Sequence, residues 1–390
     1  DRSAREPCGL RDLFDAASIV MAFKAFNDAE TAREGEDKIG VARLRGEIIG
    51  RRYGGDVGGE FCRVHHGISF EKFQLSFACR LSHVLYKYEL SGNNTPSAEG
   101  WRMAEWVTLA EAIAAHVHDG DSLALEGFTH LIPFAAGHEI IRQGRRDLSL
   151  TRMTPDIIYD QLIGAGCAKK LTFSWGGNPG VGSLNRFRDA VENGWPGPLA
   201  IEERSHSDLA NAYVAGAANL PFAVLRGYAG SDLARVNDQI RSIKCPFTGE
   251  VLAATPAVRP DVTVIHAQKA DWKGNVLLWG ILGVQKEAVL AAKRAIVTVE
   301  ERVRSLDGAP NACILPSWVV TAVCEVPHGA TPSYAHGYYE RDNSFYRAWN
   351  KISRDRDEFT SWVKQHILGT QDFAQYLRLQ SEARERAIVL

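Results

Sequence analysis

Hydrophobic and polar positions follow a regular pattern only after about residue 100. Beyond that point, short apolar runs alternate with longer amphipathic segments. Short unbroken apolar runs are typical of strands buried on both faces, and apolar residues spaced three or four apart are typical of helices. The runs indicate strands at 123–125, 148–153, 170–175, 261–268 and 294–303, and the amphipathic segments indicate helices at 106–118, 135–144, 157–166 and 286–294.

This alternation predicts the fold class. Near-continuous apolar strands need cover on both faces, and the intervening helices can supply it. We therefore expect an α/β fold, a mostly parallel sheet with helices on both faces, built from residues 103 to about 370. The helix at 106–118 also carries a start signal, because Thr108 and Glu111 have the spacing of a capping box.

Residues 1–102 show no comparable pattern. Their apolar residues follow no consistent period, and residues 91–100, SGNNTPSAEG, form a polar string rich in turn-forming residues. We expect residues 1–102 to be a poorly structured N-terminal extension that is not a native domain, and residues 103–390 to form the folded domain. Our hypothesis is that the extension is upstream sequence joined to the gene by a wrong start assignment, with translation beginning at Met103.

A real extension that holds a zinc ion is the alternative. Cys62 and His65 lie three residues apart, and Cys79 and His83 lie four apart, which are spacings that zinc ligands use. The residues between these pairs do not look like a zinc module. We therefore expect no metal in the protein.

Composition and charge exclude several function classes. The chain has 390 residues, of which 45% are apolar and 24% charged, and its net charge is −2. So small a charge creates no field that attracts nucleic acid or an anionic membrane, and no apolar run is long enough to span a bilayer. The seven cysteines are odd in number and unpaired by spacing, which favours a reducing compartment and a cytoplasmic protein.

The first candidate site follows the strand at 123–125, in DGDSLALEGFTHLIP (119–133). Polar groups at a buried strand end must find partners, and ligands of open α/β sheets bind just outside the carboxyl ends of the strands. We therefore expect Glu126, Thr129 and His130 to form one wall of a binding site. The alternative is an ordinary turn in which Gly127 supplies a positive φ and Glu126 is solvated.

A glycine cluster follows the strand at 170–175. The stretch FSWGGNPGVGS (173–183) contains Gly176, Gly177 and Asn178, and backbone N–H groups in such a loop can hold an oxyanion or a phosphate. The spacing is not that of the dinucleotide fingerprint, and Pro179 removes a donor. The alternative is a connection made of several turns.

Two further stretches carry polar residues. IEERSHSDL (201–209) suggests a Ser/His/Asp hydrolase, but neighbouring residues of a strand point to opposite faces and no G-x-S-x-G motif is present, so we disfavour a catalytic triad. IHAQKADWKGNV (265–276) runs from a strand into a Gly274–Asn275 turn. We expect that turn to be structural.

Taken together, these stretches resemble the A (alpha) subunit of the family I CoA-transferases. Asp119–Gly120, Gly127–Phe128 and Pro133 match the first signature of the family, and Glu126 stands where the first of its paired glycines usually sits. The run KADWKGN (269–275) is the most specific match. SWGGNPGVGSL, CPFTGE and AHGYYERDN place the resemblance in the branch that acts on glutaconate and 3-oxoadipate, and the likeness extends from about residue 103 to 372.

The resemblance implies a CoA-transferase-like fold and a reaction. Family members move CoA from succinyl-CoA to a free acid, here a dicarboxylic 3-oxo acid such as 3-oxoadipate, through an acyl anhydride and a thioester on a glutamate side chain. That glutamate lies in a Ser-Glu-Asn-Gly motif of the B (beta) subunit, and this sequence contains no such motif. We therefore expect one subunit of a hetero-oligomer that has no catalytic residue of its own, binds no cofactor and takes the CoA thioester as substrate.

The resemblance also implies which residues bind the acid. We expect Glu126, Thr129 and His130 to line the acid pocket. The remaining expected binding residues are Gly127, Phe128, Gly176, Gly177, Asn178 and Ser205. The alternatives are the A subunit of a glutaconate CoA-transferase, a self-sufficient acyl-CoA thioester hydrolase that uses Glu126 as its catalytic carboxylate, and a binding module without activity.

Overall fold

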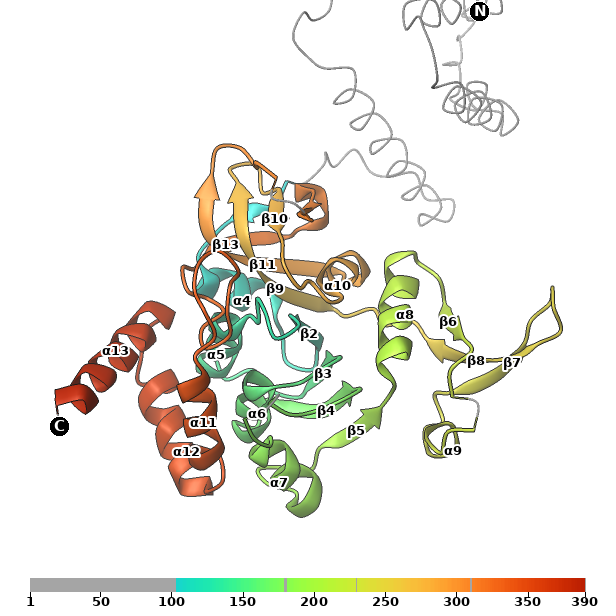
Figure 1. The fold of residues 1–390 in the computed structure, drawn as a ribbon, viewed down its shortest axis with the longest axis horizontal. Helices are drawn as coiled ribbons and strands as arrows, with labels where there is room; N and C mark the ends of the chain where they lie inside the picture. Colours follow the sequence, from blue (N-terminus) through green and yellow to red (C-terminus); the bar gives the residue numbers. More distant parts are fainter. Residues whose placement is uncertain (1–102, 179–180, 229, 309–310, 390) are drawn as a thin grey trace, which may run out of the picture. The chain divides into compact units, whose positions relative to one another are not determined.

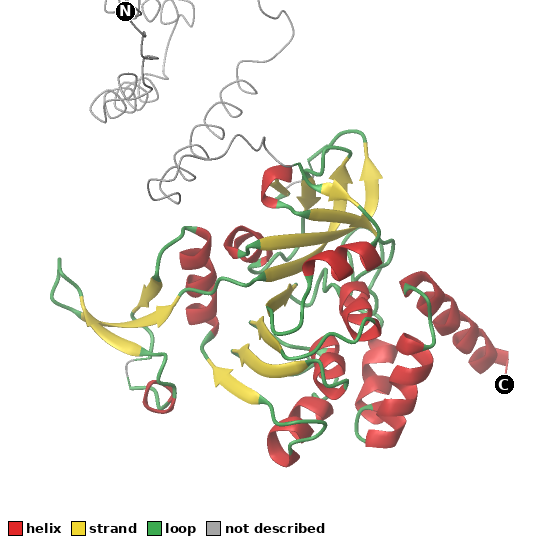
Figure 2. Cartoon of the chain, turned by 180° about the vertical axis from the view of Figure 1, so that it is seen from behind, coloured by secondary structure: helices red, strands yellow, loops and turns green. Residues whose placement is uncertain are grey.

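The computed structural model describes residues 103–178, 181–228, 230–308 and 311–389. These residues form a ten-stranded sheet surrounded by helices and a second sheet of three strands (Figure 1, Figure 2). The N-terminal extension, its four possible zinc ligands and the proposed division of the chain at residue 102 fall outside the described residues. Those three expectations stay predictions.

The larger sheet is built around eight strands whose pairings are all parallel. Two short strands, β10 (Val276–Leu278) and β12 (Cys313–Leu315), extend it by antiparallel pairing. The predicted mostly parallel sheet is therefore confirmed. The eight strands lie in the order β1 (Glu105–Trp106), β13 (Ala322–Glu325), β11 (Arg294–Val303), β9 (Val262–Asp271), β2 (Ser122–Glu126), β3 (Leu148–Arg152), β4 (Ala168–Phe173) and β5 (Ala200–Glu203).

Helices cover both faces of this sheet, and strand β2 shows why. Successive side chains of a strand point to opposite faces. Leu123 and Leu125 enter a core that is shared with α4, α5, α6 and α7, whereas Ala124 packs in a second core against α8 and α10. The helices are α4 (Leu109–His116), α5 (Phe134–Arg142), α6 (Ile157–Gly164), α7 (Asn185–Asn193), α8 (His206–Ala217) and α10 (Gln285–Ala291).

The first helix begins where its cap predicts. The Glu111 N–H donates to Thr108 Oγ1 over 3.2 Å, and the Thr108 N–H donates to Glu111 Oε2 over 2.9 Å, so the capping box is confirmed. Two bounds of the predicted helix were wrong. Trp106 lies in β1 and pairs with Val323, because the cap excludes residues before 109 from the helix, and the helix ends at His116 rather than His118.

The last helices extend the fold beyond the predicted end near residue 370. Trp349 and Trp362 pack edge to face with ring centroids 5.0 Å apart, and both are buried in the first core. The elements are α11 (Asn343–Ile352), α12 (Arg356–Val363), the π-helical turn η3 (Lys364–Leu368) and α13 (Phe373–Val389). A 3₁₀ turn, η2 (Ser317–Val319), lies between β12 and β13.

A three-stranded antiparallel sheet is inserted between α8 and β9. Its order is β6 (Phe222–Leu225), β8 (Val251–Pro256) and β7 (Arg241–Lys244), with the short helix α9 (Leu233–Val236) between β6 and β7. Phe247, in the connection between β7 and β8, is 94% exposed. No expectation had been made for this insertion.

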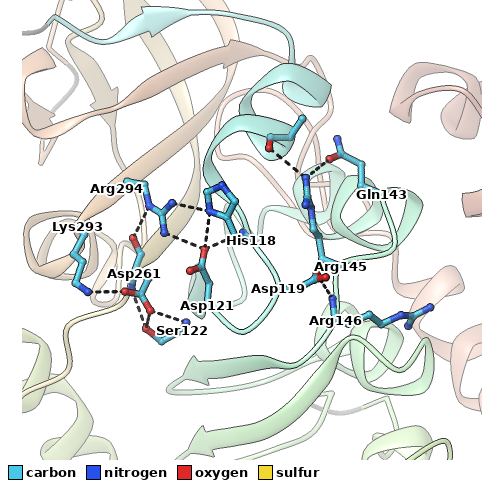
Figure 3. A network of polar contacts seen from close by, with 11 residues as sticks. His118, Asp119, Asp121, Ser122, Gln143, Arg145, Arg146, Asp261, Lys293 and Arg294 are labelled. Atoms are coloured by element: carbon cyan, nitrogen blue, oxygen red, sulfur yellow. Dashed lines mark hydrogen bonds and ion pairs between the residues drawn. The ribbon is translucent and has the colours of Figure 1, made fainter.

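Charged side chains meet at the amino ends of the parallel strands (Figure 3). Asp261, just before β9, accepts hydrogen bonds from the Ser122 hydroxyl over 2.7 Å and from Lys293 Nζ over 2.7 Å. Arg294 Nη2 donates to Asp121 Oδ2 over 3.0 Å. These contacts tie the starts of β2, β9 and β11 together at the edge opposite the predicted site.

Candidate active site

Strand β2 lies at the point where the order of the parallel sheet reverses. The chain runs outward from β2 through β3, β4 and β5 on one side, and the later strands β9, β11 and β13 fill the other side. In open parallel sheets such a switch point leaves a crevice at the carboxyl ends of the strands, where ligands bind. The stretch that the sequence singled out, which begins at Glu126, therefore lies where a ligand site is expected.

The Glu126 side chain is buried at this point, with 2% exposure. Its Oε1 accepts a hydrogen bond from the Tyr213 hydroxyl of α8 over 2.8 Å. Burial raises the pKa of the Glu126 carboxyl to about 7, although Arg152, Tyr213 and the N–H groups of Met153 and Gly127 act to lower it. The alternative interpretation, in which the Glu126 carboxylate is solvated, is therefore wrong, because this side chain points into the protein.

Arg152 fixes the turn after β2 through a buried hydrogen bond. It is fully buried, and its Nη2 donates to the Gly127 carbonyl over 2.7 Å while its Nη1 contacts Asp156 Oδ1 at 3.2 Å. Tyr159 joins β2 to β3, since its hydroxyl accepts from the Leu125 N–H over 3.0 Å and donates to the Thr151 carbonyl over 2.9 Å. The ends of β2 and β3 are thus fixed by side chains that the sequence analysis had not singled out.

The turn itself has an unusual backbone. A Cβ on Gly127 would lie 2.7 Å from the Leu131 carbonyl oxygen, so only glycine fits there. Thr129 and Leu131 have φ of 57° and 53°, in the left-handed region that is uncommon for residues with a side chain. The Ser333 hydroxyl donates to the Thr129 carbonyl over 2.8 Å and helps to hold this conformation.

The backbone N–H groups of Phe128, Thr129 and His130 have no acceptor among the residues that the structure describes. Strained backbone with unpaired N–H groups is a common feature of sites that bind anionic or oxyanionic groups. A binding role for this part of the turn stays a prediction.

His130 connects the turn to two other loops. Its Nε2 accepts from the His336 N–H over 2.9 Å, which places the ring proton on Nδ1, 3.3 Å from the Ile281 carbonyl. Burial lowers the pKa of His130 to about 4, so the ring is neutral near pH 7. Both ring nitrogens have protein partners, so a direct contact between this imidazole and the substrate would require one of these bonds to break.

The predicted glycine cluster follows β4 at the same edge. Gly176 is exposed, and the Gly177 N–H donates to the Pro155 carbonyl over 3.1 Å. The Asn178 side chain is 3% exposed, and within the described ranges neither its nitrogen nor its oxygen has a hydrogen-bond partner. A buried amide without partners is costly, which makes Asn178 a candidate for contact with a ligand or another chain.

Ser205 caps α8 rather than taking part in a triad. Its Oγ accepts from the Asp208 N–H over 3.1 Å, and its own N–H donates to the Tyr228 hydroxyl over 2.8 Å. The Asp208 carboxylate accepts from Tyr228 over 2.7 Å and from Thr255 over 2.5 Å, while His206 is exposed. The described residues form no Ser/His/Asp relay here. The strand of this stretch ends at Glu203, and the helix begins at His206.

A second buried polar cluster lies on β9 and β11. His266 Nε2 is 2.6 Å from Glu300 Oε1, and the Tyr339 hydroxyl donates to the same oxygen over 2.6 Å. Burial acts to raise the pKa of Glu300, but the bonds from His266, Tyr339 and the His328 N–H outweigh it and hold that pKa below its ordinary value. This cluster joins the two strands to the segment that carries His328 and Tyr339.

The stretch at 265–276 forms a hairpin turn between β9 and β10. Asp271 Oδ1 accepts from the N–H groups of Lys273 and Asn275, each over 2.9 Å. The turn expected at Gly274–Asn275 is therefore present, and its structural role stays a prediction.

A model of the protein family described as coenzyme A transferase matches residues 107–326, which is more than half of the chain. The chain belongs to the coenzyme A transferase family. The A subunit of 3-oxoadipate CoA-transferase from Pseudomonas knackmussii is 71% identical over 274 residues, which cover 70% of this chain and 97% of that protein.

Solved structures place the same part of the chain in the CoA-transferase fold. The crystal structure of glutaconate coenzyme A-transferase from Acidaminococcus fermentans is similar with a TM-score of 0.67 and 32% identity, over 72% of this chain and 94% of that one. A chain of the decarboxylase AibA/AibB is similar with a TM-score of 0.60 and 30% identity, over 67% of this chain and 99% of that one. The expected family and fold are confirmed.

The coenzyme A transferase chain thus brings the sequence-predicted residues to one edge. Glu126 to His130, Gly176 to Asn178 and Ser205 follow β2, β4 and β5, and the intervening Met153–Pro155 segment bonds to both of the first two groups. Their role in substrate binding stays a prediction. Sequence reasoning missed Arg152, Tyr213 and the His266 cluster, although Arg152 and His266 interrupt apolar strands and could have been noticed for that reason.

Three further findings concern a cavity, metal ligands and membrane spans. A cavity of about 460 Å³ lies between β5 and α9, lined by residues such as Lys170, Glu203 and Val236, and shares no residue with the predicted site. In the described ranges, no group of three or more His, Cys, Asp or Glu is arranged to hold a metal ion. The helices described in this chain include none with the length and apolar character needed to cross a membrane.

Proposed function

We propose that this chain is the A subunit of an enzyme that moves CoA from succinyl-CoA to 3-oxoadipate, with a B subunit that supplies the nucleophilic glutamate. One observation carries the proposal, namely the 71% identity to a relative with that name over nearly its whole length. The 32% identity to the glutaconate enzyme is much lower, so glutaconate is the second candidate for the acid.

The chemistry needs a carboxylate nucleophile. It attacks the thioester carbonyl of succinyl-CoA, and the carbon–sulfur bond breaks to leave a mixed anhydride and the CoA thiolate. The thiolate then attacks the glutamyl carbonyl of the anhydride and releases succinate, which leaves a glutamyl-CoA thioester. The acceptor acid reverses both steps and leaves as its own CoA thioester.

This chain would supply binding and oxyanion stabilisation rather than the nucleophile. The N–H groups of Phe128, Thr129 and His130, unpaired among the described residues, are suited to stabilise the oxyanion that forms when the thioester is attacked. Glu126 is buried and bonded to Tyr213, which argues against its use as an attacking carboxylate and therefore against a self-sufficient hydrolase. In this proposal CoA is a substrate, no cofactor is bound, and the enzyme works in the cytoplasm on a dicarboxylic acid.

The test is reconstitution. The full chain is assayed alone and with a 3-oxoadipate CoA-transferase B subunit, using succinyl-CoA with either 3-oxoadipate or glutaconate. We expect transfer only from the pair, and faster transfer to 3-oxoadipate. Thioester hydrolysis by the single chain would support the hydrolase, and inactivity of every combination would support the binding module.

A second measurement locates the intermediate. The pair is incubated with succinyl-CoA, the glutamyl thioester is reduced with borohydride, and the modified residue is mapped by mass spectrometry. We expect the label on the B subunit. A label on any glutamate of this chain would contradict the proposed division of labour.

A further inference from the structure

The hydrogen bond between Tyr213 and Glu126 joins two separate walls of the candidate site. Glu126 precedes the turn with the unpaired N–H groups, and Tyr213 lies on α8, whose N-cap is Ser205. Tyr213 follows Ser205 by eight residues, or roughly 12 Å along the helix axis. Both partners are buried, with exposures of 2% and 0%, so solvent does not compete for the bond.

No other side-chain hydrogen bond recorded among the described residues links Glu126 or the turn 127–130 to α8. Arg152 ties the turn to β3, and His130 ties it to the loops at 281 and 336. At its N-terminus, α8 is instead tied to the inserted sheet, through the bonds of Asp208 with Tyr228 and Thr255. Apart from the Tyr213 bond, α8 meets β2 through apolar packing, in the core that contains Ala124 and Leu209.

We propose that Glu126 and Tyr213 are positioning residues for CoA transfer, which fix helix α8 and Ser205 against the oxyanion-binding turn so that the two walls of the acid pocket stay in register. This inference rests on the proposed function. Neither side chain touches the reacting atoms. Small displacements of a binding wall lower turnover strongly, because the reacting groups must be held in attack geometry.

The strength of this bond depends on the charge of Glu126. A phenol donates more strongly to a carboxylate than to a neutral carboxylic acid. The titratable and charged groups around Glu126 are Arg152 of β3, Asp156 and Tyr159 at the start of α6, and Tyr213 itself. Asp156 pairs with Arg152 at 3.2 Å, and burial is the largest influence on Glu126, raising its pKa to about 7.

A second buried carboxyl provides a matched control. Burial also raises the pKa of Asp160 on α6 to about 7, but its carboxylate accepts from the Phe187 N–H over 2.9 Å and from Trp349 Nε1 over 3.0 Å. These partners belong to α7 and α11 and not to the candidate site. Asp160→Asn therefore removes a similar buried acid without touching the turn or α8.

The experiment compares Glu126→Gln, Tyr213→Phe, the double variant and Asp160→Asn in the complex with the B subunit. We expect each single variant in the pair to lower kcat roughly ten-fold with little change in KM for the acid, and the double variant to be no slower than the slower single variant. Wild type and Asp160→Asn should lose kcat as the pH falls through about 7, and Glu126→Gln should lack that inflection. Additive effects, or an inflection that Glu126→Gln retains, would overturn the proposal.

Amide hydrogen exchange on the full chain tests the same link without activity. In Tyr213→Phe, we expect faster exchange both in the turn 127–130 and at the start of α8, whereas Asp160→Asn should change neither segment. Exchange that rises in only one of the two segments would sink the idea. If wild type transfers no CoA, the proposed function fails while this measurement still decides whether the two walls are coupled.

Discussion

An acid lies at each end of strand β2, and the two acids differ in burial and in hydrogen-bond partners. Asp121, at the amino end, pairs with Arg294 near the surface, in the network that also contains Asp261 and Lys293 (Figure 3). Glu126, at the carboxyl end, is buried and accepts from Tyr213. Cations lie against both acids of the amino edge, whereas burial opposes the ionisation of Glu126 at the carboxyl edge.

This difference separates an edge held by ion pairs from the edge where the candidate site lies. Partial burial acts to raise the pKa of Asp261, but the Lys293 and Ser122 hydrogen bonds outweigh it and lower that pKa to about 2. The pKa of Glu126 is raised to about 7 by burial. Burial of Asp160 has the same effect outside the candidate site, so a raised carboxyl pKa does not by itself mark function. The contributions of Glu126 and Asp261 to stability should therefore depend on pH with opposite signs.

The largest effect is expected at the carboxyl edge. Arg152→Leu removes a fully buried cation and leaves Asp156 and the Gly127 carbonyl without their partner. Breaking a buried pair in this way costs roughly 3–5 kcal/mol of unfolding free energy. Urea denaturation of the variant measures the loss, and a loss under about 1 kcal/mol would show that the turn does not depend on this residue.

The next effect is a pH-dependent gain at the same edge. The folded pKa of Glu126 lies above its ordinary value, so its favourable contribution is present below about pH 4.5 and is lost as the pH rises through about 7. As the pH rises from 5 to 9, the unfolding free energy of Glu126→Gln should therefore increase by up to about 3 kcal/mol relative to that of wild type. Parallel denaturation curves at the two pH values measure this shift, and a constant difference would contradict it.

The amino edge should show the opposite sign. The folded pKa of Asp261 lies below its ordinary value, so its contribution is present above about pH 4 and is lost as the pH falls through about 2. Asp261→Asn should cost roughly 1–2 kcal/mol of unfolding free energy near pH 6, because solvent screens this partly exposed ion pair, and the cost should shrink in acid. Denaturation between about pH 6 and pH 3 provides the measurement, and a cost that grows in acid would reverse the comparison.

The smallest effect is expected for a single cation of the amino edge. Arg294→Gln removes the 3.0 Å contact with Asp121, in which the Arg294 side chain is 27% exposed. Such pairs contribute about 1 kcal/mol or less and are weakened by salt. Unfolding in low and high salt should show a small loss that decreases as salt is added, and a loss comparable to that of Arg152→Leu would erase the difference between the edges.

Much of the parallel sheet could be predicted because hydrophobic period and local signals agree along its strands and in the first helix. β3 begins at Leu148 and β11 spans Arg294–Val303 as expected, and α4 begins after the predicted Thr108 cap. The inserted sheet and the last helices were not predicted. In β6 of the insertion, the large apolar residues Phe222 and Val224 are exposed while Ala223 and Leu225 are buried, so the apolar residues do not mark one core face in the sequence. Helix α13 has a weakly apolar pattern and packs against α5.

The sequence predicted the site residues that lie in one continuous segment. It did not predict the residues that are brought together only by the fold. Glu126 to His130 could be identified because polar groups at the carboxyl end of a buried strand can be read from the local sequence. Tyr213 lies 87 residues away, inside an amphipathic helix, and looks like any core aromatic until the fold places its hydroxyl on Glu126. The same applies to Glu300, whose contact with His266 depends on the pairing of β9 with β11.

The alternation in β2 has a consequence for how this protein can be changed. Leu123 and Leu125 belong to one core, and Ala124 between them belongs to the other. Inserting or deleting one residue would turn leucines toward α8 and alanine toward α5, so neither core would fill. The length of β2 is therefore fixed by the two cores that it separates, whereas substitutions within the strand are limited to residues of similar size.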